Sequence, residues 1–140
     1  AGFDLVNGEY VNIDPIAAMF NDAWIPQAIH MTIAAFAATG FGVMVGTIFG
    51  THQQATTFGS VSVVIMAAIG GIWVPLFAMP PFMQVLGMIS PLNWTMEAFN
   101  DLFLRGGDLS SVIPECAAMF GFSAFCMMVT YFYNRKKLGV

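Results

Sequence analysis

Charged residues are scarce in this chain of 140 residues, and basic residues are scarcer than acidic ones. Only 9% of the residues are charged and four in all are Lys or Arg, whereas soluble domains carry about 25% charged residues. No Asp, Glu, Lys or Arg occurs between Asp22 and Glu97, a stretch long enough for two membrane crossings of about 20 residues each. Since 58% of the residues are hydrophobic, we expect an integral membrane protein embedded in a lipid bilayer. So few basic residues offer no phosphate-binding surface, which excludes nucleic acid as a partner.

Several chemical motifs are also missing. The sequence has no Gly-x-x-x-x-Gly-Lys-Ser/Thr loop, so the chain is not expected to hydrolyse ATP or to be an enzyme. No group of His, Cys or carboxylate residues has the spacing of a metal site, and no catalytic residue is predicted. Cys116 and Cys126 are ten positions apart. On a helix this is about 15 Å, too far for a disulfide.

The first 26 residues form an acidic segment without Lys or Arg, which we expect outside the membrane. Asn7-Gly8 between two short apolar pieces predicts a tight hairpin turn. Asp14-Pro15 predicts a capped helical turn, closed by Asn21-Asp22. Because the segment lacks a basic region, no cleavable signal peptide is expected.

The rest of the chain, residues 27–140, predicts an all-α, polytopic membrane domain. Three transmembrane helices are expected, at about 27–50, 58–79 and 112–133, with a polar link at 51–57 between the first two. The apolar pieces between about 81 and 105 are too short to span, so they predict a re-entrant or interfacial helical hairpin. Gly70, Gly71 and Pro75 fall inside the second predicted span and are expected to loosen it and to cause a kink or an early break.

The orientation follows from the basic residues. Three of the four lie together at Arg135, Lys136 and Lys137, directly after the third predicted span. Cytoplasmic ends of membrane proteins carry an excess of Lys and Arg, so the C-terminus is expected in the cytoplasm. With three spans, the N-terminus and the 81–105 hairpin then lie outside.

A series of motifs runs in order from about residue 37 to residue 140. They are Ala38-Thr39-Gly40-Phe41-Gly42, Gly46-Thr47-Ile48-Phe49, Thr51-His52-Gln53-Gln54-Ala55, Gly70-Gly71-Ile72-Trp73-Val74-Pro75, Met79-Pro80, Ser90-Pro91-Leu92-Asn93-Trp94 and Asp101-Leu102-Phe103-Leu104-Arg105-Gly106-Gly107. This part resembles the C-terminal part of the membrane permease of type-2 ABC exporters.

The resemblance implies a function and partners. Such a permease subunit lies in the cytoplasmic (inner) membrane of a prokaryote, dimerises or pairs with another permease half, and binds two cytoplasmic ATPase subunits. It moves a hydrophobic or amphipathic substrate outward by alternating access. Gly70, Gly71 and Pro75 would then supply helix flexibility, and the hairpin would form an outer gate. Three spans are half of what the family uses.

A second resemblance concerns about residues 1–42. Its motifs are Gly2-Phe3-Asp4-Leu5-Val6-Asn7-Gly8, Asp14-Pro15, Phe20-Asn21 and Ile29-His30-Met31-Thr32, which resemble subunit I of cytochrome bd quinol oxidases. This resemblance implies that His30 is an axial ligand of haem b, although neither Met31 nor Met44 on the same helix has the geometry of a second ligand. The alternatives are a hydrogen-bonded interfacial His30 without haem, and a membrane fragment without transport. A natural fusion, a truncated gene product and an artificial sequence all fit this junction.

Further candidate residues lie in the hairpin and in the third span. Pro91 and Trp94 belong to the hairpin's central break. Glu97, Asp101 and Arg105 are spaced four apart on one helix face, where Asp101 and Arg105 predict a structural ion pair. Glu115, in the first turn of the third span, fits the positive end of the helix dipole or a place on the substrate pathway.

Overall fold

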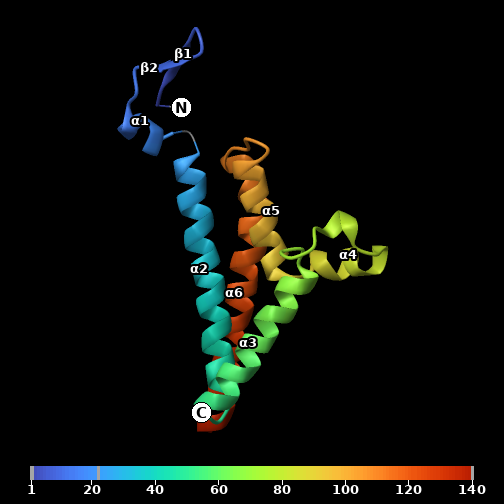
Figure 1. Cartoon of the computed structure of the whole chain (residues 1–140). Helices are drawn as coiled ribbons and strands as arrows, with labels where there is room; N and C mark the ends of the chain where they lie inside the picture. Colours follow the sequence, from blue (N-terminus) through green and yellow to red (C-terminus); the bar gives the residue numbers. More distant parts are fainter. Residues whose placement is uncertain (1, 22, 140) are drawn as a thin grey trace.

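Helices dominate the computed structural model, which describes residues 2–21 and 23–139. Two long helices, α2 (Trp24–Ile48) and α6 (Leu109–Leu138), run side by side in the same direction (Figure 1). Both are long and apolar enough to cross a membrane. At about 1.5 Å per residue, each exceeds the roughly 30 Å of a bilayer's hydrocarbon core. The long helices predicted at about 27–50 and 112–133 are confirmed, and their boundaries differ from the prediction by a few residues.

Two long-range hydrogen bonds fix the register of α2 against α6. The Ser123 hydroxyl donates to the carbonyl of Phe36 at 3.1 Å, and the Tyr133 hydroxyl donates to the carbonyl of Ile48 at 3.2 Å. The two helices approach closely near the first of these bonds because Gly40 has no side chain. A Cβ atom at this position would lie only 3.0 Å from the Ser123 hydroxyl. The two helices therefore descend together from the N-terminal end of the bundle (Figure 1).

The N-terminal segment confirms the predicted hairpin. β1 (Asp4–Val6) pairs antiparallel with β2 (Glu9–Val11), and both turn residues, Asn7 and Gly8, have positive φ, as a two-residue hairpin turn requires.

A short helix follows, also as predicted. In α1 (Pro15–Met19) the Asp14 carboxylate accepts hydrogen bonds from the amides of Ile16 and Ala17. The predicted end at Asn21-Asp22 falls partly outside the described residues, since Asp22 is not among them, and α1 itself ends at Met19.

The second predicted span, 58–79, is wrong at both ends. α3 (His52–Ile69) begins six residues earlier and ends ten residues earlier. It begins early because the Thr51 hydroxyl caps it by accepting from the Gln54 amide at 3.2 Å, so most of the predicted polar link is helical. It ends early because Gly71 takes a φ of +86°, a left-handed conformation that terminates helices. With 18 residues it is about 27 Å long.

The region predicted as a helical hairpin contains two short helices, as expected, and its re-entrant or interfacial place in the membrane stays a prediction. After a 3-10 turn, η1 (Leu76–Ala78), come α4 (Pro81–Met88) and α5 (Pro91–Phe103). α4 projects sideways, whereas α5 starts near the end of α3 and runs back along α6 toward the N-terminal end of the bundle (Figure 1). The buried core lies between α2, α5 and α6 and comprises Ala37, Ala98, Leu102, Val112, Cys116 and Met119. Of the two short helices, α5 is therefore packed into the bundle.

Candidate functional site

The most distinctive site is the joint where α3 ends and α5 begins. The Ser90 hydroxyl donates a hydrogen bond of 2.9 Å to the carbonyl of Met66 in the last turn of α3, and that carbonyl also accepts the Gly70 amide at 2.8 Å. Ser90 is 3% exposed and Asn93, in the first turn of α5, is 6% exposed. The Met66 carbonyl therefore accepts two hydrogen bonds, and the bond from Ser90 joins the start of α5 to the last turn of α3.

Glycine is required at this joint for reasons of space. A side chain at Gly70 would lie 2.6 Å from the Met66 carbonyl oxygen, 2.8 Å from the Ser90 hydroxyl and 3.1 Å from the Asn93 amide. A side chain at Gly87, near the end of α4, would lie 2.6 Å from the Ile69 carbonyl oxygen. The ends of α3 and α4 therefore approach each other more closely than any larger residue permits.

Gly70, Gly71 and Pro75 were predicted to lie inside the second span, and the structure places them after the end of α3. Gly70 and Gly71 follow the last residue of α3, and Pro75 precedes η1. Of the two predicted outcomes, a kink and an early break, the structure shows the early break, and the chain after it turns toward α4. The structure brings Gly70 to Ser90 and Asn93, two residues that the sequence did not single out as a site. Their signals were the Ser-Pro pair that begins α5, a pattern typical of a helix start, and the motif Ser90-Pro91-Leu92-Asn93-Trp94.

The residues of the hairpin hold its two helices together. Pro91 is the first residue of α5, where its missing amide costs nothing. The Trp94 indole donates a hydrogen bond of 2.7 Å to the carbonyl of Met88 at the end of α4, and its ring packs against the buried core. Trp94 therefore links α4 to the α5–α6 pair rather than serving only as an interfacial anchor.

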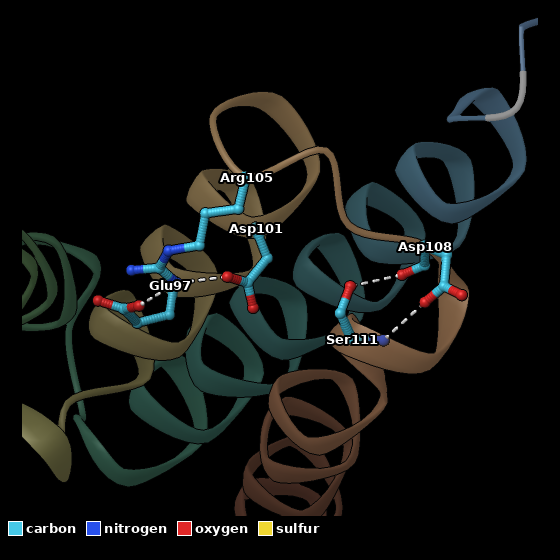
Figure 2. A network of polar contacts seen from close by, with 5 residues as sticks. All are labelled: Glu97, Asp101, Arg105, Asp108 and Ser111. Carbon is cyan, nitrogen blue, oxygen red and sulfur yellow. Dashed lines mark hydrogen bonds and ion pairs between the residues drawn. The ribbon is translucent and has the colours of Figure 1, made fainter.

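The predicted ion pair is confirmed at the far end of α5 (Figure 2). The Arg105 guanidinium donates to Asp101 and, at 3.2 Å, to Glu97. These hydrogen bonds, first to Asp101 and then to Glu97, raise the pKa of Arg105 above its ordinary value. The Arg105 side chain is 60% exposed and that of Asp101 is 18% exposed. Exposed ion pairs contribute little to stability, so this cluster lies at the end of α5 and adds little to the stability of the fold.

A neighbouring cap was missed in the sequence. The Asp108 carboxylate accepts hydrogen bonds from the amides of Ser110 and Ser111 at the start of α6. Figure 2 shows the bond from Ser111. The Ser110 hydroxyl, which donates to the same carboxylate at 2.6 Å, and then the Ser111 amide lower the pKa of Asp108. The signal was an Asp directly before a long apolar run, the usual sign of a helix start.

His30 and Glu115 lie level with each other on α2 and α6. The register set by Phe36 with Ser123 places His30 beside the turn that carries Glu115. His30 is 2% exposed and interacts with the backbone of Thr95 in α5 and with Glu115. His30 Nε2 and Glu115 Oε2 are both buried without a hydrogen-bond partner, which is costly inside a membrane.

The packing around His30 does not fit a haem. An axial ligand needs open space beside its free ring nitrogen for the porphyrin, yet His30 Nε2 has almost no accessible surface. Within the described part of the chain, no group of three or more His, Cys, Asp or Glu residues has the arrangement of a metal site. The described packing therefore leaves no room for a haem at His30.

Comparison with known proteins points to one family. Residues 11–104 match the family model described as ABC-2 type transporter. The linearmycin resistance permease protein LnrN of Bacillus subtilis (strain 168) is 25% identical over 101 residues, which are 71% of this chain and 26% of LnrN. The chain thus spans about a quarter of that relative's length. No solved structure matches the chain significantly.

The family match bears on both resemblances seen in the sequence. It supports the permease-like one and takes in α2, α3, α4 and α5. It also begins at residue 11, inside the segment that resembles an oxidase. None of these comparisons supports the oxidase-like segment.

Proposed function

The chain belongs to the ABC-2 type transporter family, and from this premise we propose that it is the C-terminal part of the membrane subunit of an ATP-driven exporter. The observation that supports this most directly is the family match across the joint itself, since residues 11–104 contain the end of α3, α4 and the start of α5. ATP would be hydrolysed by a separate cytoplasmic subunit, because the chain has no phosphate-binding loop.

The proposed topology has three crossings. α2 and α6 each cross the bilayer alone. α3 is about 27 Å long and ends at the joint, from which α5 runs on toward the start of α6. The third crossing is therefore shared by α3 and α5. This arrangement leaves the acidic N-terminal segment outside and Arg135, Lys136 and Lys137 in the cytoplasm.

The proposed substrate is hydrophobic or amphipathic and moves outward by alternating access. Gly70 and Gly71 at the joint would permit the change of angle between α3 and α5, and the hairpin with Glu97, Asp101 and Arg105 at its end would form the outer gate. Glu115 faces the same outer half from α6. A second permease unit, identical or related, would complete the pathway.

The test is assembly with an ATPase. The full-length permease containing this chain is co-expressed with its ATP-binding subunit and reconstituted into lipid vesicles, and vanadate-sensitive ATP hydrolysis and efflux of a lipophilic dye are measured. The matched variants are Gly70→Leu at the joint and Gly121→Leu on the exposed face of α6. We expect Gly70→Leu to abolish dye efflux while the ATPase still co-purifies, and Gly121→Leu to retain efflux. A permease that binds no ATPase and moves no dye would contradict the proposal.

A further inference from the structure

Two polar side chains on adjacent helices each bury one atom that has no hydrogen-bond partner among the described residues. His30 on α2 is 2% exposed, and its unpartnered atom is Nε2. Glu115 on α6 is partly exposed, but its Oε2 atom is buried and unpartnered. Most buried polar groups in proteins are hydrogen-bonded, so each exception requires an explanation. An ionisable side chain inside a membrane is costly unless it has a partner.

The packing of α2 against α6 places the two residues at the same level of the bundle. The helices run side by side in the same direction (Figure 1). The bond from Tyr133 to the carbonyl of Ile48 sets their register, and Glu115 and His30 each precede these residues by 18 positions. The other long-range bond between the two helices gives a difference of two positions, which is about 3 Å. Both bonds therefore place the imidazole and the carboxyl side by side.

The helix α5 closes the same place from a third direction. His30 interacts with the backbone of Thr95 and with Glu115. The Thr95 hydroxyl lies 3.2 Å from the sulfur of Met119, which is one helical turn after Glu115 and on the same face of α6. The imidazole and the carboxyl therefore lie inside the packed part of the bundle, between α2, α5 and α6.

The other charged groups around this place are engaged elsewhere. On α5, Glu97 and Asp101 both bond to Arg105, whose side chain is 60% exposed. On α6, the neighbouring titratable group is the buried free thiol of Cys116. The helices α2, α3 and α4 contain no Asp, Glu, Lys or Arg. Within the described part of the chain, the imidazole of His30 is thus the group that can pair with Glu115.

A neutral pair satisfies both buried atoms at the lowest cost. Glu115 lies in the second turn of α6, which begins at Leu109, so it is beyond the first turn in which the helix dipole acts. Two opposite charges in a buried place need further hydrogen bonds to offset their loss of water. A protonated carboxyl, in contrast, donates one hydrogen bond, and the Nε2 atom of a neutral imidazole accepts it. Pro114 removes a backbone hydrogen bond of α6 beside Glu115, which lets this turn adjust to the bond.

We propose that His30 and Glu115 form a buried proton-binding site, in which the protonated carboxyl of Glu115 donates a hydrogen bond to Nε2 of His30. The proton comes from water through the partly exposed side of Glu115 and leaves by the same path, so that only the O–H bond of the carboxyl forms and breaks. When the proton leaves, the carboxylate has nothing to donate and the link between α2 and α6 is lost. The site therefore couples the binding of one proton to the packing of these two helices, and it does not depend on transport.

Infrared spectroscopy of the full-length permease containing this chain tests the site, with the proton and the deuteron as probes. The protein is held in lipid nanodiscs at neutral pH. A protonated carboxyl gives a carbonyl band that moves to lower wavenumber when D₂O replaces H₂O. We expect Glu115→Gln to remove one such band from the wild-type spectrum. The matched control, Glu97→Gln, changes an ion-paired carboxyl and should retain the band. If Glu115→Gln removes no band, the proposal is overturned.

A second set of variants tests whether His30 accepts the hydrogen bond. His30→Leu removes the acceptor, so we expect the Glu115 band to move to higher wavenumber. His52→Leu makes the same change at the chain's other histidine, at the start of α3, and should leave the band in place. If His30→Leu does not fold, His30→Gln keeps a polar side chain of another kind and should also move the band. A band that stays in place in the His30 variant that folds would show that Glu115 bonds to another group and would overturn the proposal.

Discussion

The hydroxyl of Ser90, at the start of α5, donates a hydrogen bond of 2.9 Å to the carbonyl of Met66 in the last turn of α3. The two residues are 24 positions apart, and Ser90 is almost completely buried. This bond joins the end of one helix to the beginning of another at the point where the chain changes direction. We therefore expect the joint to be rigid in the state described and sensitive to small substitutions.

Removing the hydroxyl should weaken the fold measurably. Ser90→Ala is expected to lower the free energy of unfolding by about 1 kcal/mol, the net value of one buried hydrogen bond, in a denaturant titration in mild detergent. The control is Ser60→Ala, since the Ser60 hydroxyl is exposed and bonds only to the Thr56 carbonyl of its own helix. Equal losses in the two variants would show that the joint has no special role.

A methyl group at the joint should be destabilising where the same group elsewhere is not. In Gly70→Ala the new carbon would crowd the Met66 carbonyl and the Ser90 hydroxyl, and overpacking of this kind costs about 1–3 kcal/mol. Gly121→Ala, on α6, meets no atom within 4 Å. It should be neutral or stabilise by about 0.5–1 kcal/mol through helix propensity. A stable Gly70→Ala protein would contradict the close approach described here.

The cap of α6 should make stability depend on pH in one direction. The pKa of Asp108 is lowered below its ordinary value of 3.8. Its contribution is therefore present above that value and is lost as the pH falls through the lower pKa of the folded protein. The unfolding midpoints of wild type and Asp108→Ala should differ at neutral pH and converge in acid. Asp108→Asn, which keeps the capping oxygen but does not titrate, should show no such convergence toward Asp108→Ala.

The buried imidazole and carboxyl should be replaceable together by apolar residues. Because His30 Nε2 and Glu115 Oε2 are both buried without a hydrogen-bond partner, the double variant His30→Leu with Glu115→Leu is expected to leave stability unchanged or to raise it. A reduced-minus-oxidised visible spectrum of the purified wild-type protein should show no haem band. A haem band that His30→Leu removes would show that a porphyrin fits at His30 after all.

Composition predicted the helical membrane class, because a long apolar stretch in lipid must satisfy its backbone hydrogen bonds internally, as a helix does. The N-terminal hairpin and the Asp14 cap were also predictable, since Asn-Gly and Asp-Pro act through local geometry. The end of α3 was predicted only as one of two alternatives, a kink or an early break at Gly70, Gly71 and Pro75. Hydropathy continues unbroken past Ile69, whereas the helix stops because Gly71 adopts a left-handed conformation and Ser90 supplies a distant donor.

The candidate site, like the fold, could be predicted only in part from the sequence. Arg105, Asp101 and Glu97 were predictable as a group because helix spacing brings them together. The joint and the pair of His30 with Glu115 depend on contacts between helices that no local pattern encodes. These two residues were singled out separately in the sequence, and only the packing of α2 against α6 places them level with each other.

The claim that α3 and α5 share one crossing is tested most directly by cysteine accessibility. In a chain with Cys116→Ala and Cys126→Ala, single cysteines are introduced as Leu104→Cys after α5 and as His52→Cys at the start of α3, and intact cells are treated with a membrane-impermeant maleimide. We expect Leu104→Cys to be labelled from outside and His52→Cys to be labelled only after the membrane is permeabilised. Labelling of both positions from the same side would contradict it.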